Sequence, residues 1–105
     1  MWDSILGKST RIGSGIILAN RRFDQKNIEI KINGKKYDMG TDFFGAVIGD
    51  TTRLGANCTT VPGTCIGPYT WILPTVQVRN FVPAEKRILP KAEYVIQDNP
   101  RVELK

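Results

Sequence analysis

Residues 46 to 78 decide the fold. From Ile48 they read IGDTTR, LGANCT, TVPGTC, IGPYTW, ILPTVQ and V when the chain is cut every six residues. The first positions are aliphatic with one exception, and they comprise Ile48, Leu54, Thr60, Ile66, Ile72 and Val78. The fifth positions are small or β-branched, and they comprise Thr52, Cys58, Thr64, Thr70 and Val76. A period of six fits neither an α-helix nor a single alternating strand, so it predicts a solenoid.

The hexad also predicts the shape of each coil. Six residues make one short strand and one corner, so three hexads close a triangular coil with the first and fifth positions pointing inward. Glycine follows three of the aliphatic starts and eases the turn of the backbone. The same period recurs earlier at Leu6, Ile12 and Leu18, which gives about three coils in total. A β-sandwich with chance spacing is the alternative interpretation.

The repeat breaks between residues 20 and 44. Ile28, Ile30 and Ile32 alternate there with charged residues, as in a half-buried strand. Asn33-Gly34 follows and favours a tight hairpin turn. We therefore expect a β-helix over residues 1–82 with a hairpin loop at 20–44. The period is lost from Pro83, and residues 83–105 are expected to be a tail that packs on the coil or is partly disordered.

Composition limits the possible partners. The chain has 105 residues and a net charge of +5, which suits an anionic ligand. It has no basic run interleaved with aromatic residues, so we expect no nucleic acid. No apolar stretch reaches the length of about 18 residues needed to span a membrane, and no signal peptide opens the chain. We therefore expect a cytoplasmic protein without membrane contact.

Histidine is absent from the chain. This excludes an imidazole general base, a Ser-His or Cys-His nucleophile and a histidine-ligated zinc ion. Cys58 occupies an inward small position, and we expect it to be a buried core residue rather than a metal ligand or half of a disulfide. The sequence therefore assigns no catalytic residue and no metal site.

Three segments resemble a known family. They are Ile12-Gly-Ser-Gly-Ile-Ile-Leu-Ala-Asn-Arg-Arg-Phe-Asp24, the hairpin after it, and Gly45-Ala-Val-Ile-Gly-Asp50. They resemble the C-terminal left-handed β-helix of archaeal and bacterial sugar-1-phosphate nucleotidylyltransferases, which include glucose-1-phosphate thymidylyltransferases and N-acetylglucosamine-1-phosphate uridylyltransferases. The similarity covers about residues 3 to 82, and the loop entry at 19–24 is its most specific part. The resemblance implies an all-β, single-stranded left-handed parallel β-helix with an inserted hairpin loop.

The resemblance also implies an activity. Many members are bifunctional, and their β-helix half is an acetyltransferase that uses acetyl-CoA and an amino-sugar 1-phosphate. The nucleotidylyltransferase half is absent here. So is the His-x-x-Tyr pair that the family carries a few residues ahead of the stretch matching Asp3-Ser4. Weak or no activity of the chain alone is therefore expected, and a truncated start or a fragment remains an open interpretation.

The resemblance also implies roles for individual residues of this chain. Asn20 matches the asparagine that holds the amino sugar, Lys26 matches a loop lysine near the substrate phosphate, and Arg22 completes this candidate substrate-binding set. A second family lysine falls at Glu29, where the charge is reversed. The resemblance further places acetyl-CoA along a groove lined by Ala56 and Pro74. The alternatives are a left-handed corner residue for Asn20 and a solvated charge for Lys26.

Two functions remain open from the sequence. One is an acyltransferase-type homotrimer that binds acetyl-CoA or a sugar phosphate between subunits. The other is a non-catalytic scaffold that forms trimers and supports a separate nucleotidylyltransferase chain. Both rest on the expectation that a short β-helix with a thin core associates through its flat faces.

Overall fold

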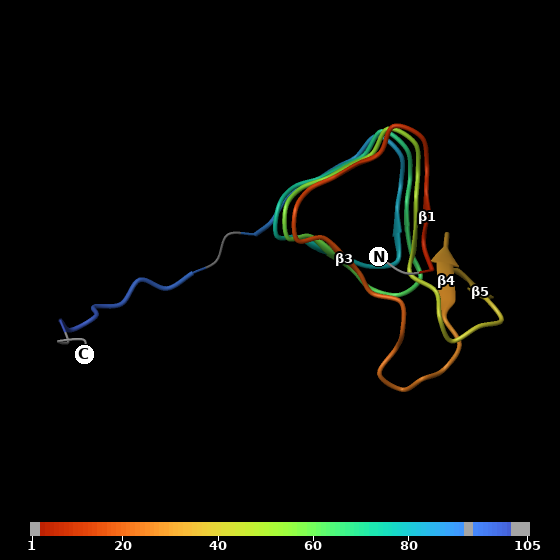
Figure 1. Cartoon of the computed structure of the whole chain (residues 1–105), viewed down its shortest axis with the longest axis horizontal. Coiled ribbons are helices and arrows are strands. Elements are labelled where there is room, and N and C mark those ends of the chain that lie inside the picture. Colours follow the sequence, from red (N-terminus) through yellow and green to blue (C-terminus); the bar gives the residue numbers. More distant parts are fainter. Residues whose placement is uncertain (1–2, 92–93, 102–105) are drawn as a thin grey trace.

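The chain winds into a triangular coil, which Figure 1 shows from its end. The computed structural model describes residues 3–91 and 94–101. Its short strands form three parallel sheets, which are the sides of the triangle, and one antiparallel hairpin. The prediction of a left-handed parallel β-helix with an inserted hairpin is confirmed.

Successive strands go to successive sides of the triangle. Sheet A contains β1 (Ile5–Leu6), β6 (Ala46–Ile48), β9 (Thr64–Ile66) and β12 (Phe81–Val82). Sheet B contains β2 (Arg11–Ile12), β7 (Arg53–Leu54), β10 (Trp71–Ile72) and β13 (Arg87–Ile88). Sheet C contains β3 (Ile17–Leu18), β8 (Thr59–Thr60) and β11 (Gln77–Val78). Three coils are therefore complete, and β12 and β13 begin a fourth.

The first hexad positions form the core, as predicted. From Ile48 to Val78 each is at most 4% exposed. The positions pair in register across the coils, for example Leu6 with Ile48 and Ile48 with Ile66. A side chain at the end of a strand thus packs on its equivalent in the next coil. Burial of this aliphatic column supplies the main favourable free energy of folding.

The fifth hexad positions connect one coil to the next. The Thr52 hydroxyl donates a hydrogen bond to the carbonyl oxygen of Gly67 at 3.2 Å, and the Cys58 thiol donates to that of Leu73 at 3.0 Å. Both side chains are completely buried, and Cys58 is a free thiol, as expected. Small polar residues are suited to these positions because they fit inside the corner and satisfy its buried carbonyl groups.

The hairpin consists of β4 (Glu29–Ile32) and β5 (Lys35–Asp38). Asn33 and Gly34 both have positive φ angles, of 50° and 80°, as the predicted tight turn requires. Ile28 and Ile30 are buried, so the hairpin is held against the body of the protein. It leaves the coil at the corner between sheets C and A (Figure 1).

The β-helix extends beyond the expected boundary at residue 82. Strand β13 pairs in parallel with β10 and places Ile88 beside Ile72. The spacing obscured this strand, because Val82 follows Val78 by four positions whereas Ile66 follows Thr60 by six. A sequence signal did exist: Ile-Leu-Pro occurs both at residues 72–74 and at residues 88–90.

The tail beyond β13 leaves the coil at the corner between sheets B and C (Figure 1). Residues 94–101 form no strand, and Tyr94, Val95 and Ile96 are each about four-fifths exposed. The remaining residues of the expected tail segment, 92–93 and 102–105, lie outside the described residues.

Thr60 provides a test of the core. It occupies an aliphatic position, and its buried hydroxyl oxygen has no hydrogen-bond partner in the described structure. Thr60→Val removes this polar group with little change of shape, so we expect the free energy of unfolding to rise by about 1–2 kcal/mol in urea denaturation.

The matched control is Thr64→Val. The hydroxyl of Thr64 donates to the carbonyl oxygen of Val61 at 2.6 Å, and its loss should lower the unfolding free energy by about 1 kcal/mol. Equal shifts in the two variants would contradict this account.

Candidate functional site

Asn20 is the first residue of the loop at residues 20–44, and it contacts both the end of the loop and the first coil. Its backbone carbonyl accepts a hydrogen bond from the Phe44 amide at 2.9 Å. Its side-chain amide donates to Asp3 Oδ2 at 3.1 Å. Asn20 is not among the residues with positive φ, so the alternative of a left-handed corner residue is wrong. The side chain is half-buried and held in place at the start of the loop.

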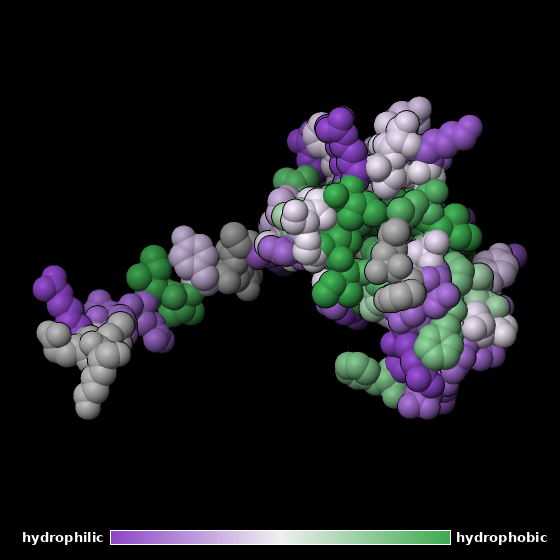
Figure 2. All heavy atoms as spheres, viewed as in Figure 1, coloured by the Kyte–Doolittle hydropathy of each residue, from purple (hydrophilic) through white to green (hydrophobic). Residues whose placement is uncertain are grey.

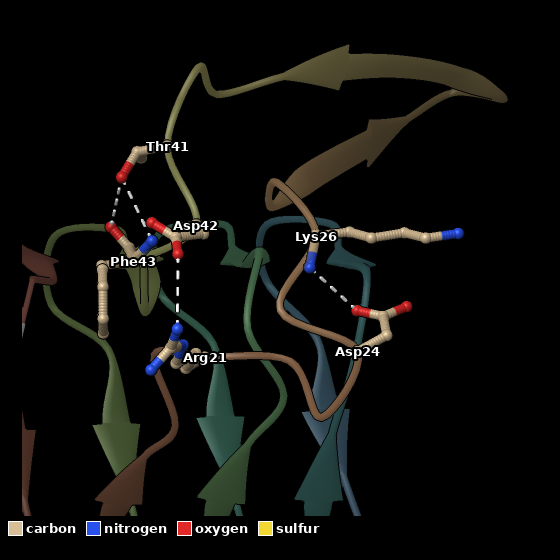
Figure 3. A network of polar contacts seen from close by, with 6 residues as sticks. All are labelled: Arg21, Asp24, Lys26, Thr41, Asp42 and Phe43. Atoms are coloured by element: carbon tan, nitrogen blue, oxygen red, sulfur yellow. Dashed lines mark hydrogen bonds and ion pairs between the residues drawn. The ribbon is translucent and has the colours of Figure 1, made fainter.

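Arg22 and Lys26 are organised around Asp24. The Arg22 guanidinium donates two hydrogen bonds to the Asp24 carboxylate, at 2.9 and 2.5 Å. The backbone N–H of Lys26 donates to the same carboxylate at 3.1 Å. These hydrogen bonds, that of Arg22 first, hold the pKa of Asp24 below its ordinary value of 3.8. The Lys26 side chain points away from this carboxylate (Figure 3).

A second set of contacts holds the loop's two ends together. The Arg21 guanidinium lies 3.6 Å from the Asp42 carboxylate and 4.6 Å from the centre of the Phe43 ring. Thr41 caps the returning chain, because its hydroxyl accepts a hydrogen bond from the Phe43 amide at 3.1 Å (Figure 3). Exposed contacts of this kind each stabilise by less than about 1 kcal/mol, but together they fix the loop's entry and exit.

A groove lies on the outer side of sheet B, and we call it the coil groove. It has a volume of about 390 Å³, and its wall includes Arg11, Arg53, Trp71, Leu73 and Pro74. Pro74 is one of the two residues expected to line an acetyl-CoA groove. Ala56, the other, is not part of the wall but is exposed on the adjoining corner.

Glycines allow neighbouring coils to lie close together beneath this groove. A Cβ atom added at Gly55 would lie 2.6 Å from the Pro74 nitrogen, and one at Gly13 would lie 2.8 Å from the Ala56 nitrogen. Real Cβ atoms do not approach the backbone so closely. Neighbouring coils therefore meet at this corner only because these positions lack a side chain.

A column of positive charge runs along the coil groove. Arg11 and Arg53 are directly paired in neighbouring strands, and Trp71 follows in the next strand. The Arg53 guanidinium lies 5.7 Å from the centre of the Trp71 ring, and that of Arg87 lies 5.1 Å from it. None of these arginines forms an ion pair within the described residues. The ring orients two guanidiniums whose hydrogen-bond donors remain available for an anion.

Sequence reasoning missed these arginines as site residues. They are far apart in the chain, but each directly precedes an inward aliphatic residue of sheet B. The signal was therefore the hexad position shared by Arg11, Arg53, Trp71 and Arg87. Equivalent hexad positions in successive coils become neighbours in space.

The loop residues and the coil groove lie at different corners of the triangle. The loop leaves the corner between sheets C and A, and the groove lies towards the corner between sheets B and C. The whole width of sheet C separates them. One copy of the chain therefore does not bring Asn20, Arg22 and Lys26 together with Ala56 and Pro74.

Metal-binding clusters and membrane-spanning helices are absent from the described part of the chain. No group of three or more His, Cys, Asp or Glu side chains is placed to hold a metal ion. No helix there is long and apolar enough to cross a membrane.

The chain is similar to parts of several known proteins, although no family model matches it. A bifunctional sugar-1-phosphate nucleotidylyltransferase/acetyltransferase of Sulfurisphaera tokodaii is 38% identical over 80 residues, which are 76% of this chain and 20% of that protein. The bifunctional protein GlmU of Methanococcus aeolicus is 32% identical over 95 residues, which are 90% of this chain and 23% of that protein. The chain thus spans about a fifth of the length of these relatives.

A solved structure supports the fold. Serine acetyltransferase isoform 3 of Entamoeba histolytica, in complex with cysteine, superimposes with a TM-score of 0.64 at 15% identity. The match covers 92% of this chain and 29% of that one.

The Asp24 cluster predicts a measurable titration. Because contacts with Arg22 and Lys26 lower its pKa, the carboxylate should stay ionised below pH 3.8 and release Arg22 only as the pH falls further. A carbon-detected NMR titration should therefore give a midpoint below 3.8. In Arg22→Gln the midpoint should move back towards 3.8, and an unchanged midpoint would show that Arg22 does not cause the shift.

Proposed function

We propose a function from the premise that the chain is a hexapeptide-repeat β-helix domain matching the acetyltransferase half of bifunctional sugar-1-phosphate nucleotidylyltransferases. The proposed function is to bind acetyl-CoA and a sugar phosphate in clefts between copies of the chain. The loop of one copy supplies Asn20, Arg22 and Lys26, and the coil groove of a neighbour supplies the acetyl-CoA site. The observation that carries this proposal is the separation of the two half-sites by the width of sheet C.

The coil groove suits the chemistry of acetyl-CoA. That molecule consists of a phosphorylated adenosine joined through a pyrophosphate to a long, uncharged arm that ends in the thioester. Arg11 and Arg53 are neighbours without an acidic partner in the described structure, so a pyrophosphate would relieve their mutual repulsion. The floor of Gly13 and Gly55 leaves room for the arm to lie along the coils towards Pro74.

The chain's contribution to acetyl transfer is binding and orientation. In that reaction the amine nitrogen attacks the thioester carbon, an amide forms, and the thiol of CoA leaves. The attacking nitrogen must also lose a proton to a base. No histidine is present in this chain to accept it. We therefore assign Asn20 to orienting the amino sugar and assign no residue here as the base.

A second candidate function is assembly without catalysis, and an apolar surface favours it. Ile5, Val47, Cys65 and Phe81 point outward from sheet A and align in register across the four strands. Ile5 is 59% exposed and Phe81 is 37% exposed. Apolar residues also gather over the end of the coil in Figure 2. Such a surface is suited to contact with another copy in a closed, symmetric trimer.

Acetyl-CoA binding tests the first function. We expect millimolar acetyl-CoA to raise the melting temperature, because a ligand that binds only the folded state stabilises it. Arg53→Gln should weaken the binding about tenfold or more by isothermal titration, as expected for the loss of one charge-assisted contact. Lys8→Gln, a change of an exposed charge that does not line the groove, is the control. No melting shift with the parent chain would overturn the acetyl-CoA assignment.

The oligomeric state tests the assembly. We expect light scattering after gel filtration to give the mass of three chains, and Phe81→Glu to give smaller species because it buries a charge in the contact. Gln77→Glu places the same charge on an exposed position of strand β11, which belongs to sheet C rather than sheet A, and should leave the trimer intact. A monomeric parent chain would contradict both proposed functions.

A further inference from the structure

A second pocket lies between the hairpin and the coil, and we call it the hairpin pocket. Its volume is about 320 Å³. One wall is the corner at Val61 and Pro62, and the other includes Glu29, Lys31 and Lys36 of the hairpin. The two walls are close together, since a Cβ atom added at Gly63 would lie 2.4 Å from the carbonyl oxygen of Glu29. This pocket is therefore part of the folded structure rather than a gap beside a loose loop.

Two lysines face each other in this pocket. Lys31 of β4 is the direct cross-strand partner of Lys36 of β5. Like charges at directly opposed positions of an antiparallel pair are unfavourable. Neither lysine forms an ion pair within the part of the chain that the structure describes. The hairpin thus places two ammonium groups where their repulsion is unrelieved.

Other polar groups surround these lysines. Arg22, from the loop, lies in the same pocket, although Asp24 neutralises its charge. Asn80 contributes its amide from the corner before β12. Glu29 is the one acidic residue of the lining and forms no ion pair in the described structure. The balance of charge, two free lysines against one carboxylate, leaves the pocket positive.

We propose that the hairpin pocket binds the phosphate group of a small phosphate monoester through Lys31 and Lys36. A phosphate dianion matches two opposed ammonium groups in charge, and its oxygens accept hydrogen bonds from both. Arg22 joins this pocket to the loop that holds Asn20. The inference rests on the proposed function and deepens it, because it identifies which residues hold the phosphate of the sugar phosphate.

This assignment explains how a phosphate can bind despite Glu29. The family resemblance expects a lysine at this position, and a carboxylate there repels phosphate. The hairpin supplies Lys31 and Lys36 on the same face, two and seven positions further along the chain. The positive charge is therefore shifted along the hairpin rather than lost. Glu29 in turn limits how strongly the pocket attracts anions.

Isothermal titration of the full chain with glucose 1-phosphate tests the proposal. We expect one saturable site per chain, with Lys31→Gln and Lys36→Gln each weakening the affinity about tenfold or more, as expected for the loss of one charge-assisted hydrogen bond. Lys35→Gln removes an equal charge from the same hairpin but not from the pocket, and it should bind like the parent. An equal loss in Lys35→Gln would reveal non-specific attraction and overturn the proposal.

Two further measurements separate binding from a structural role. Glu29→Gln should increase the affinity several-fold, because it removes the one repelling carboxylate from the pocket. Without ligand and at low salt, Lys36→Gln should melt no lower than the parent chain, since it relieves the repulsion with Lys31. A decrease of affinity in Glu29→Gln, or a lower melting temperature in Lys36→Gln, would contradict the proposal.

Inorganic phosphate and glucose identify the ligand class. We expect both to bind more weakly than glucose 1-phosphate, and equal binding of inorganic phosphate would assign the pocket to the free anion instead. Binding of glucose 1-phosphate at the hairpin pocket does not depend on acetyl-CoA binding in the coil groove. If Arg53→Gln no longer binds acetyl-CoA but still binds the sugar phosphate, both proposals are supported. If the parent chain binds the sugar phosphate but not acetyl-CoA, the proposed function fails while the hairpin pocket stands.

Discussion

The hydrogen bonding of each coil to the next is the constraint on which the rest of the structure depends. A strand of two or three residues has no stability of its own, so every side of the triangle must pair with an equivalent strand above or below it. This pairing requires that the coils approach closely at their corners. Gly13 and Gly55 allow it, because a Cβ atom at either position would contact the backbone of the next coil.

The same constraint explains what the sequence could predict. Stacking of equivalent positions makes burial periodic, so the buried residues from Ile48 to Val78 could be identified by spacing alone. The hairpin was predictable because Asn33-Gly34 encodes its turn locally. Strand β13 was not found, since a shorter corner after Val78 changes the spacing without disturbing the pairing. A period counted along the chain fails where corners vary in length, whereas a recurring Ile-Leu-Pro segment does not.

The site was less predictable than the fold for a geometric reason. Resemblance identified Asn20, Arg22, Lys26, Ala56 and Pro74, but it could not indicate the corner of the triangle at which each residue lies. Only the three-dimensional path shows that sheet C separates the loop from the coil groove. Arg11 and Arg53 were overlooked as neighbours because the residues between them include an entire hairpin, although their shared hexad position indicated the pairing. Hexad position, not distance along the chain, determines which side chains meet.

Stacked equivalent positions also concentrate charge, and this links fold to function. Stacking of hexad positions places Arg11 beside Arg53. The antiparallel hairpin, which lies outside the repeat, places Lys31 opposite Lys36 in the same way. Each pair carries an electrostatic cost in the unliganded chain. A bound phosphate group converts that cost into attraction, because one anion interacts with both cations at once. Both like-charged pairs lie in a groove or pocket, where an anion can reach both cations, so the repulsion stored in the free protein favours ligand binding.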